Sequence, residues 1–328
     1  MIKAEELATV ISALGKGKSF FITSHQEPDG DAICSMLALG SLLRRVGKTV
    51  HLELCDQIPE RYRFVPHWEE ISYHYDQRDH RSDGYTFIVL DSGELCRVGE
   101  GIAELTSGST EIINIDHHIS NQYFGSINLV DANASATGEI VGVIYQSLGI
   151  EPTEDEAFCI YTAIFTDTGA FRYSNTTPLS LRIAAEMIEK GVLPQVVSRA
   201  ISENKNFGNL KLMGFALSTL TSALNGQFVY LYLSRAMYGN SGITGMGDTE
   251  GLVNFARSIK GCRVSALFRE TEDGRVKVSL RGSEGIDVNT VALYFGGGGH
   301  EMASGYISRE NLEATIETLN KHLVNILK

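Results

Sequence analysis

Carboxylate and imidazole side chains gather in four short segments of this 328-residue chain. The densest segment is Asp116-His117-His118, which directly follows the apolar residues 112–115. The other three segments also stand where an apolar run ends, and they contain His25, Asp29 and Asp31, then Asp91, and then Asp167. Carboxylates that converge without a cation would repel one another and raise each other's pKa values. A bound divalent metal ion removes this repulsion, so the pattern predicts a metal site.

The donor types indicate which metal would bind and what it would do. Asp and His ligands without Cys favour Mn²⁺, with Mg²⁺ or Co²⁺ as alternatives and Zn²⁺ less favoured. There are enough ligands for two ions, which at roughly 3.5–4 Å apart share a hydroxide and clamp both oxygens of an in-line displacement at phosphorus. The plain alternative is a set of unrelated acids, in which Asp29 caps a helix. A cap explains that one carboxylate and leaves the rest of the set unexplained.

Buried strands are expected to position these side chains, at residues 19–23, 49–54, 85–90 and 112–115. Helical spacing covers residues 5–14, 32–46, 134–148 and 153–165. Such alternation of strands and helices indicates a parallel sheet, and open sheets of this kind build their sites at the carboxyl ends of the strands. Asp167 follows the carboxyl end of a helix, where the helix dipole disfavours an anion. Its position is a further argument for a bound cation.

The second half of the chain has a different pattern. Residues 178–221 are mainly helical in spacing, strands are expected at 228–233, 263–268 and 276–281, and helices at 251–259, 288–295 and from 309 onward. The expected fold class is α/β, with a mainly parallel-sheet catalytic domain flanked by helices, a smaller mixed α/β substrate-binding domain, and the active site in the interdomain cleft. The expected domains are residues 1–195 and 227–328, joined by a helical linker at 196–226.

A run of four glycines, residues 296–299, precedes His300 in the second domain. Glycines leave backbone N–H groups free to surround an anion, and His300 adds a donor. Arg281 and Asn289 stand upstream, and a guanidinium binds phosphate through two parallel hydrogen bonds. Taken alone, a glycine-rich turn is more often a flexible connector than a phosphate site.

Composition restricts the classes of partner. The net charge of −12 is uneven, because residues 1–195 carry 28 acids and 14 Lys or Arg, whereas residues 196–328 carry 12 and 14. The acidic balance offers no basic track for long nucleic acid. The first six residues include two acids where a leader peptide would carry cations, no apolar run approaches membrane-spanning length, and the five cysteines are scattered. We expect a cytoplasmic protein without membrane contacts, and the oligomeric state, including a homodimer, stays open.

The four segments resemble the hallmark blocks of the DHH phosphoesterases. They stand here as residues 24–32, 90–92, 116–118 and 165–169, and residues 296–305 look like the substrate-binding motif of the DHH-associated domain. The layout is most similar to the branch of bacterial oligoribonucleases (nanoRNases) and 3′-phosphoadenosine 5′-phosphate (pAp) phosphatases. The resemblance implies one metal on His25, Asp29 and Asp91, and another on Asp31, Asp91, His117 and Asp167. It makes Asp116 a residue that orients a ligating histidine and puts His118 beside the reacting phosphate, so that the expected catalytic residues are His118, Asp116 and Asp91.

By the same resemblance, the terminal phosphate and sugar of a nucleotide bind to Arg281, Asn289, Gly297, Gly298, Gly299 and His300. We expect hydrolysis of short single-stranded oligonucleotides or dinucleotides to 5′-mononucleotides, of pAp to AMP, or of both. Alternatives are a phosphodiesterase of linear or cyclic dinucleotide signals, a RecJ-type single-strand exonuclease, and, in a different class, a nucleotide sensor without catalysis. The sequence does not rank these substrates or fix the cleavage polarity.

Overall fold

The computed structural model describes residues 2–73, 84–106, 111–203, 207–243, 249, 251–283 and 285–327, and only the main chain of His300. It divides into two compact units, residues 1–204 and 205–328. Among the described residues, every helix is too short or too polar to cross a membrane. All five cysteines are free thiols.

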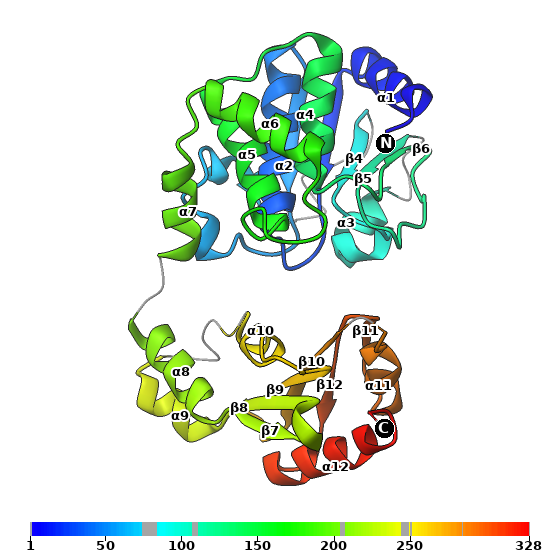
Figure 1. The fold of residues 1–328 in the computed structure, drawn as a ribbon. Helices are drawn as coiled ribbons and strands as arrows, with labels where there is room; N and C mark the ends of the chain where they lie inside the picture. The colour runs from blue at the N-terminus through cyan, green and yellow to red at the C-terminus, as the bar shows by residue number, and fades with distance from the viewer. Residues whose placement is uncertain are drawn as a thin grey trace. The chain divides into compact units, whose positions relative to one another are not determined.

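The first unit alternates strands and helices along the chain (Figure 1). Its elements are α1 (Ala4–Lys16), β1 (Ser19–Thr23), α2 (Gly30–Arg45), β2 (Thr49–Glu53), β3 (Ile71–Ser72), β4 (Thr86–Leu90), α3 (Glu100–Thr106), β5 (Ile112–Asp116), β6 (Ile127–Val130), α4 (Thr137–Leu148), α5 (Glu154–Asp167), α6 (Pro178–Glu189) and α7 (Pro194–Ser202). The strands expected near residues 19, 49, 85 and 112 are present. Two further strands, β3 and β6, were not expected from the sequence.

The strands of the first unit form one parallel sheet in the order β3-β2-β1-β4-β5-β6. The strand order reverses beside β1, because the chain continues outward to β2 and β3 on one side and resumes with β4 on the other. In open α/β sheets, ligands bind outside the carboxyl ends of the strands at such a reversal point. The residues that follow β1 and β4 therefore occupy the favoured place for a site.

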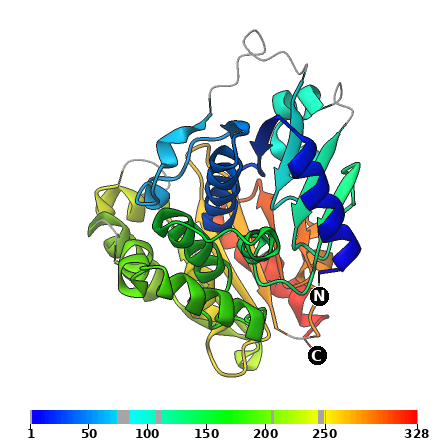
Figure 2. The ribbon, with the colours of Figure 1, turned by 90° about the horizontal axis from the view of Figure 1, so that it is seen from above.

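The two faces of this sheet are covered by different elements. Alternate strand residues, such as Phe20 and Ile22, are fully buried against α1, α2, α4 and α5. The residue between them, Phe21, joins a smaller cluster on the other face with α3. Side chains alternate between faces along a strand, and a full apolar side chain removed from water contributes roughly 1.5–3 kcal/mol. Helices α2, α4 and α5 pack side by side (Figure 2).

Two glycines allow the helices that carry site residues to approach closely. A Cβ on Gly30, the first residue of α2, would lie 2.7 Å from the Thr166 side chain of α5. A Cβ on Gly138 of α4 would lie 2.3 Å from the Cβ of Ala163. Side chains at either position would push the helices apart. The amino ends of α2 and α4 are thereby held against α5.

The second unit is built on a mixed sheet in the order β11-β12-β10-β9-β8-β7, in which β8 and β9 are parallel and the other neighbours are antiparallel. Its elements are α8 (Phe207–Ser218), β7 (Thr221–Ala223), β8 (Phe228–Leu233), α9 (Arg235–Ser241), α10 (Leu252–Arg257), β9 (Val264–Glu270), β10 (Val276–Gly282), α11 (Val288–Tyr294), β11 (Gly298–His300), β12 (Ala303–Ser308) and α12 (Leu312–Val324). One face packs on α11 and α12, and the other on α8, α9 and α10. The expected α/β class, with a parallel sheet and a second mixed sheet, is confirmed.

Candidate metal centre

The parallel sheet delivers the polar residues to its carboxyl edge. His25 follows β1, Asp91 follows β4, and Asp116 ends β5. The start of α2 adds Asp29 and Asp31, and the end of α5 adds Asp167. Donor atoms within 4.8 Å of one another form three groups among the described residues: Asp91 with His117 and His118, Asp91 with His25 and Asp29, and Asp31 with His117 and Asp167. Segments up to 142 positions apart in the chain thus meet at one place.

Asp91 lies at the centre of the cluster. Its Oδ2 lies 3.5 Å from Nε2 of His25, and its Oδ1 lies 3.5 Å from Nε2 of His117 and 3.8 Å from Nδ1 of His118. The residue is buried, and its φ of +54° is in the left-handed region, which few non-glycine residues adopt. Such strain at a functional group persists only where the surroundings enforce it.

Backbone carbonyls orient two of the histidines. Nδ1 of His25 lies 2.7 Å from the carbonyl oxygen of Gln26, and Nδ1 of His117 lies 3.3 Å from that of Ala134. A carbonyl accepts only an N–H, so the hydrogen of each neutral ring is on Nδ1. The lone pair on Nε2 then faces the carboxylates, as a metal ligand requires.

The amino end of α4 fixes two of the carboxylates. The backbone N–H groups of Thr137 and Gly138 donate to Asp31, at 2.6 and 2.8 Å, and Ser35 Oγ donates to the same carboxylate at 2.9 Å. The Thr137 hydroxyl donates to Oδ1 of Asp91 at 3.0 Å. The sequence analysis missed Thr137 and Ser35, because neither belongs to a run of metal-ligand residue types.

Asp116 is fully buried and pairs with His118. Its Oδ1 lies 2.6 Å from Nδ1 of His118, and its Oδ2 accepts a hydrogen bond of 2.6 Å from Asn121. From the resemblance, Asp116 was expected to orient a metal-ligating histidine, and no particular histidine was named. In the structure its partner is the neighbouring His118, the residue that the resemblance puts beside the phosphate.

Asp29 and Asp167 complete the cluster from two helix ends. Asp29 caps α2 through a hydrogen bond from the N–H of Ala32, at 3.1 Å, so the capping alternative is correct for this one carboxylate. It also lies in the group with His25 and Asp91. Asp167 accepts a hydrogen bond of 3.1 Å from Asn175, and its Oδ2 lies 3.8 Å from Nε2 of His117.

The charges of the cluster depend strongly on one another. Burial alone would raise the pKa of Asp91, but hydrogen bonds from His117 and His25 outweigh it and hold that pKa well below its usual range. Burial would lower the pKa values of His25 and His117, but the Asp91 carboxylate raises them to about 9 and about 10. Burial raises the pKa of Asp31 well above its usual range and that of Asp167 to about 6.

Without a metal ion, the raised pKa values of His25 and His117 favour protonated rings beside the carboxylates. A divalent cation supplies the same positive charge while the imidazoles become neutral ligands. The donor set of carboxylate oxygens and imidazole nitrogens suits Mn²⁺, Mg²⁺ or Co²⁺. The arrangement therefore fits bound divalent metal.

The residues expected to bind substrate lie in the second unit. Strand pairing places Arg281 opposite Ala303, and Ala303 opposite His300, so the three stand in one row across the sheet. The side chain of His300 is outside the described part of the chain. Oδ1 of Asn289 is buried and finds no hydrogen-bond partner among the described residues.

The three glycines before His300 differ in their surroundings. A Cβ on Gly297 would lie 2.1 Å from the carbonyl oxygen of Gly305, and one on Gly299 would lie 2.6 Å from Cα of Ser304. Both glycines are therefore required for close pairing of β11 with β12. A Cβ on Gly298 would meet nothing within 4 Å. Of the three, only Gly298 has open space beside it.

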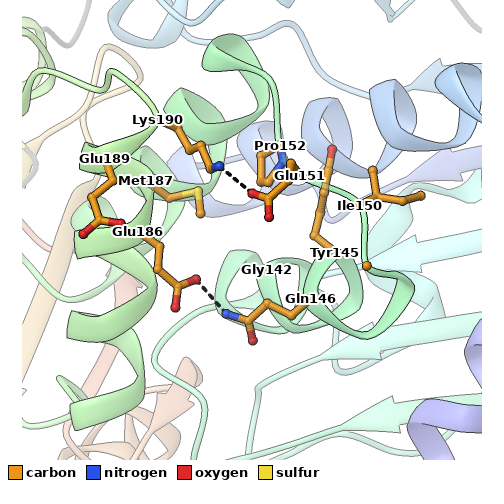
Figure 3. A pocket seen from close by; sticks show the side chains of 11 residues that line it. Gly142, Tyr145, Gln146, Ile150, Glu151, Pro152, Glu186, Met187, Glu189 and Lys190 are labelled. Carbon is orange, nitrogen blue, oxygen red and sulfur yellow. Dashed lines mark hydrogen bonds and ion pairs between the residues drawn. The ribbon is translucent and has the colours of Figure 1, made fainter.

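A separate cavity of about 420 Å³ lies at the other end of α4 and contains none of the cluster residues (Figure 3). Its polar side chains largely satisfy one another: Lys190 pairs with Glu151 at 2.5 Å, and Gln146 donates to Glu186 at 2.7 Å. The cavity lacks the convergent metal-ligand atoms of the cluster. We therefore assign the chemistry to the cluster at the sheet edge.

Comparison with known proteins identifies the families that match this chain. The model of the DHH family, N-terminal domain, matches residues 19–164, and the DHHA1 domain matches residues 225–325. The bifunctional oligoribonuclease and PAP phosphatase NrnA of Thermus thermophilus is 37% identical over 286 residues, which are 87% of this chain and 82% of that protein. The protein of the same name from Bacillus subtilis is 28% identical over 310 residues, covering 90% of this chain and 93% of its own.

A solved structure has the same fold along the whole chain. It is an exopolyphosphatase-related protein from Bacteroides fragilis, with a TM-score of 0.91 and 26% identity, covering 100% of this chain and 98% of its own. Both family models and a relative above 30% identity over most of its length show that this chain belongs to the DHH family of phosphoesterases and carries a DHHA1 domain in its second half.

Proposed function

We propose that this protein is a divalent-metal-dependent hydrolase that cleaves short oligonucleotides to 5′-mononucleotides and converts pAp to AMP. The observation that carries the proposal is the convergence of His25, Asp91 and His117, with Asp29, Asp31 and Asp167, at one edge of the sheet. Relatives that align with most of this chain are named for both activities. The two activities share one bond type, because both break an ester at phosphorus linked to a 3′ oxygen.

Bound Mn²⁺ would supply the positive charge that activates water and neutralises charge at phosphorus. His25, Asp29 and Asp91 would hold one ion, and Asp31, Asp91, His117 and Asp167 the other, with Asp91 common to both. Asp116 would keep the Nδ1 hydrogen of His118 in place, so that the Nε2 atom of His118 faces the reacting phosphate. The amides of α4 would fix Asp31 in the geometry that its ion needs.

Recognition of the nucleotide is proposed for the second unit. Arg281 would bind a terminal phosphate through its guanidinium. The free oxygen of Asn289 and the open backbone at Gly298 would contribute further polar contacts, with His300 in the same row of the sheet as Arg281. Replacement of Arg281 by Ala should lower kcat/KM for a dinucleotide by about ten- to a hundredfold, because a charged hydrogen bond is lost, while both metal ions stay bound.

A turnover panel in Mn²⁺ tests the proposal. The substrates are pAp, 5′-phosphorylated dimers to pentamers, a 20-mer and cyclic dinucleotides. We expect hydrolysis of pAp and the short oligomers and much slower hydrolysis of the 20-mer. Preference for the 20-mer would favour a RecJ-type exonuclease, and preference for cyclic dinucleotides a signalling phosphodiesterase. Binding without any turnover would identify a sensor and overturn the proposal.

A further inference from the structure

The metal cluster is open to solvent on one side. The side chains of Asp31 and Asp91 are 1% and 3% exposed, whereas those of Asp167 and His118 are 28% and 30% exposed. A phosphate that approaches the buried carboxylates must therefore come from the side of Asp167 and His118. Residues beside these two border the path of the substrate.

The chain after Asp167 has an unusual backbone. Gly169, Ala170 and Phe171 have φ values of +56°, +59° and +62°, so three successive residues are in the left-handed region. A helix end needs only one such residue, and each non-glycine residue in this region costs free energy. The three residues form a left-handed turn that directly follows the helix carrying Asp167.

This left-handed turn, residues 169–171, sends its neighbouring aromatic side chains in different directions. Phe171 packs inward against Tyr161 and Phe165 of α5. Tyr173 is 55% exposed, and the hydroxyl end of its ring lies on Gly169, where a Cβ would be 2.4 Å from Cζ. No described residue makes a hydrogen bond to the Tyr173 hydroxyl. The strained turn thus holds a largely exposed aromatic ring against Gly169, which is two residues after Asp167.

We propose that Tyr173 is a stacking platform for a nucleobase adjacent to the scissile phosphate. The proposal rests on the function proposed above and identifies what this chain offers to the base. The ring contacts Gly169 at its hydroxyl end and is 55% exposed, which leaves aromatic surface for a flat partner. Stacking on an aromatic ring is possible for every base, so it gives affinity without sequence preference. Such a contact suits an enzyme that must accept mixed short oligomers.

The test compares Tyr173→Ala and Tyr173→Phe with the parent protein. The substrates are pApA, two analogues of it that lack one base each, and an analogue that lacks both. In Mn²⁺, Tyr173→Ala should lower kcat/KM for pApA by about five- to a hundredfold, the range for one lost stack. The loss should fall to less than about twofold on the analogue without bases and on one of the two single-base analogues, which identifies the stacked base. Tyr173→Phe, which keeps the ring, should recover most of the loss.

Two controls separate stacking from a structural role. The melting temperature and the Mn²⁺ affinity of Tyr173→Ala should match those of the parent, since the cluster itself is not altered. Leu181→Ala removes another exposed apolar side chain of the first unit, 49% exposed on α6, and should leave all substrates unaffected.

The outcomes distinguish this inference from the proposed function. Suppose that the parent hydrolyses pApA and that Tyr173→Ala lowers kcat/KM equally for every substrate, including the analogue without bases. Tyr173 then supports the fold of the site, and the stacking role is wrong. An unchanged kcat/KM of Tyr173→Ala for pApA would also overturn the stacking role. If the parent hydrolyses neither pApA nor pAp, the proposed function itself fails, and the stacking role fails with it.

Discussion

Asp91 shares its two carboxylate oxygens among three histidines, a position that no other carboxylate of the described cluster occupies. Asp116, by contrast, contacts only His118 among the histidines of the cluster. We expect Asp116→Asn to lower kcat by about ten- to a hundredfold, as is typical when a residue that orients a site group is changed. Asp91→Asn should cost more, because Asp91 is the ligand common to both ions in the proposed centre. Metal content and kcat of the two variants decide the order, and a larger loss for Asp116→Asn would show that Asp91 is not the shared ligand.

The raised histidine pKa values predict proton release on metal binding. Their pKa values of about 9 and about 10 lie above the unfolded value near 6.5, so protonated His25 and His117 stabilise the metal-free fold fully below about pH 6.5. This stabilisation is lost as pH rises through 9 to 10. At pH 7.5 a metal must displace both protons. Titration calorimetry with Mn²⁺ in buffers of different ionisation enthalpy should give a proton release approaching two, and a heat independent of buffer would contradict this.

At the scale of elements, α4 positions Asp31 only if it stays close to α5. Gly138→Ala would place a Cβ 2.3 Å from Ala163. The crowding should lower the free energy of unfolding by about 1–3 kcal/mol and weaken Mn²⁺ binding, because the amides on Asp31 move. Gly214→Ala is the matched control, since it adds a Cβ in open space within α8 and should stabilise by about 0.5–1 kcal/mol. Urea unfolding and a metal titration measure both effects, and unchanged metal affinity in Gly138→Ala would show that the amides are not needed.

The glycine run offers a similar pair of variants. Gly298→Ala meets no neighbour within 4 Å and should leave the free energy of unfolding within about 0.5 kcal/mol of the parent. If the backbone there surrounds a phosphate, kcat/KM for pApA should still fall. Gly299 has a φ of +147°, and a Cβ there would lie 2.6 Å from Cα of Ser304, so Gly299→Ala should destabilise the second unit. Normal turnover of pApA by a stable Gly298→Ala protein would argue that the run serves only strand packing.

The sequence predicted elements well where apolar runs were long. Strands β1, β4 and β5 are unbroken runs of buried residues, and all were expected. The missed strands lack that signal: β3, β7 and β11 have only two or three residues, β6 is an edge strand that is mostly half-buried, and β12 reads Ala-Ser-Gly-Tyr-Ile-Ser. Their hydrogen bonds come from neighbours that are distant in the chain, and no local pattern encodes such pairing.

Site residues, too, could be predicted only where the local sequence carries a signal. Asp and His at strand ends were visible because residue type and position coincide. Thr137, Asn121 and Asn175 were not visible, because they act only through hydrogen bonds to a ligand or its partner. Threonine and asparagine are common in loops and at helix starts, so their types alone carry no signal. The contribution of α4 to the site could be found only from the folded arrangement.

For the whole molecule, metal binding should stabilise one unit selectively. The cluster belongs entirely to residues 1–204. A ligand at a hundred times its Kd stabilises the unit that binds it by about 2.7 kcal/mol. We would compare calorimetric unfolding in chelator with unfolding in Mn²⁺. The unfolding temperature of the first unit should be higher in Mn²⁺, and that of the second unit should be unchanged. Chelation should also abolish hydrolysis. An equal shift of both transitions, or full activity in chelator, would contradict the assignment of the metals.

The spacing of the cluster along the chain has a consequence for biosynthesis. His25 is among the first residues to leave the ribosome, whereas Asp167 and its partner Asn175 emerge about 150 residues later. The group of Asp91 with His25 needs β1 paired with β4, the group of Asp91 with His117 needs β4 paired with β5, and the group containing Asp31 needs the end of α5. Every ligand lies in the first unit, so the full set can assemble once residues 1–204 have emerged, while the second unit is still being synthesised. The metal centre can therefore be complete on a chain that still lacks its second unit, where the substrate-binding residues are proposed.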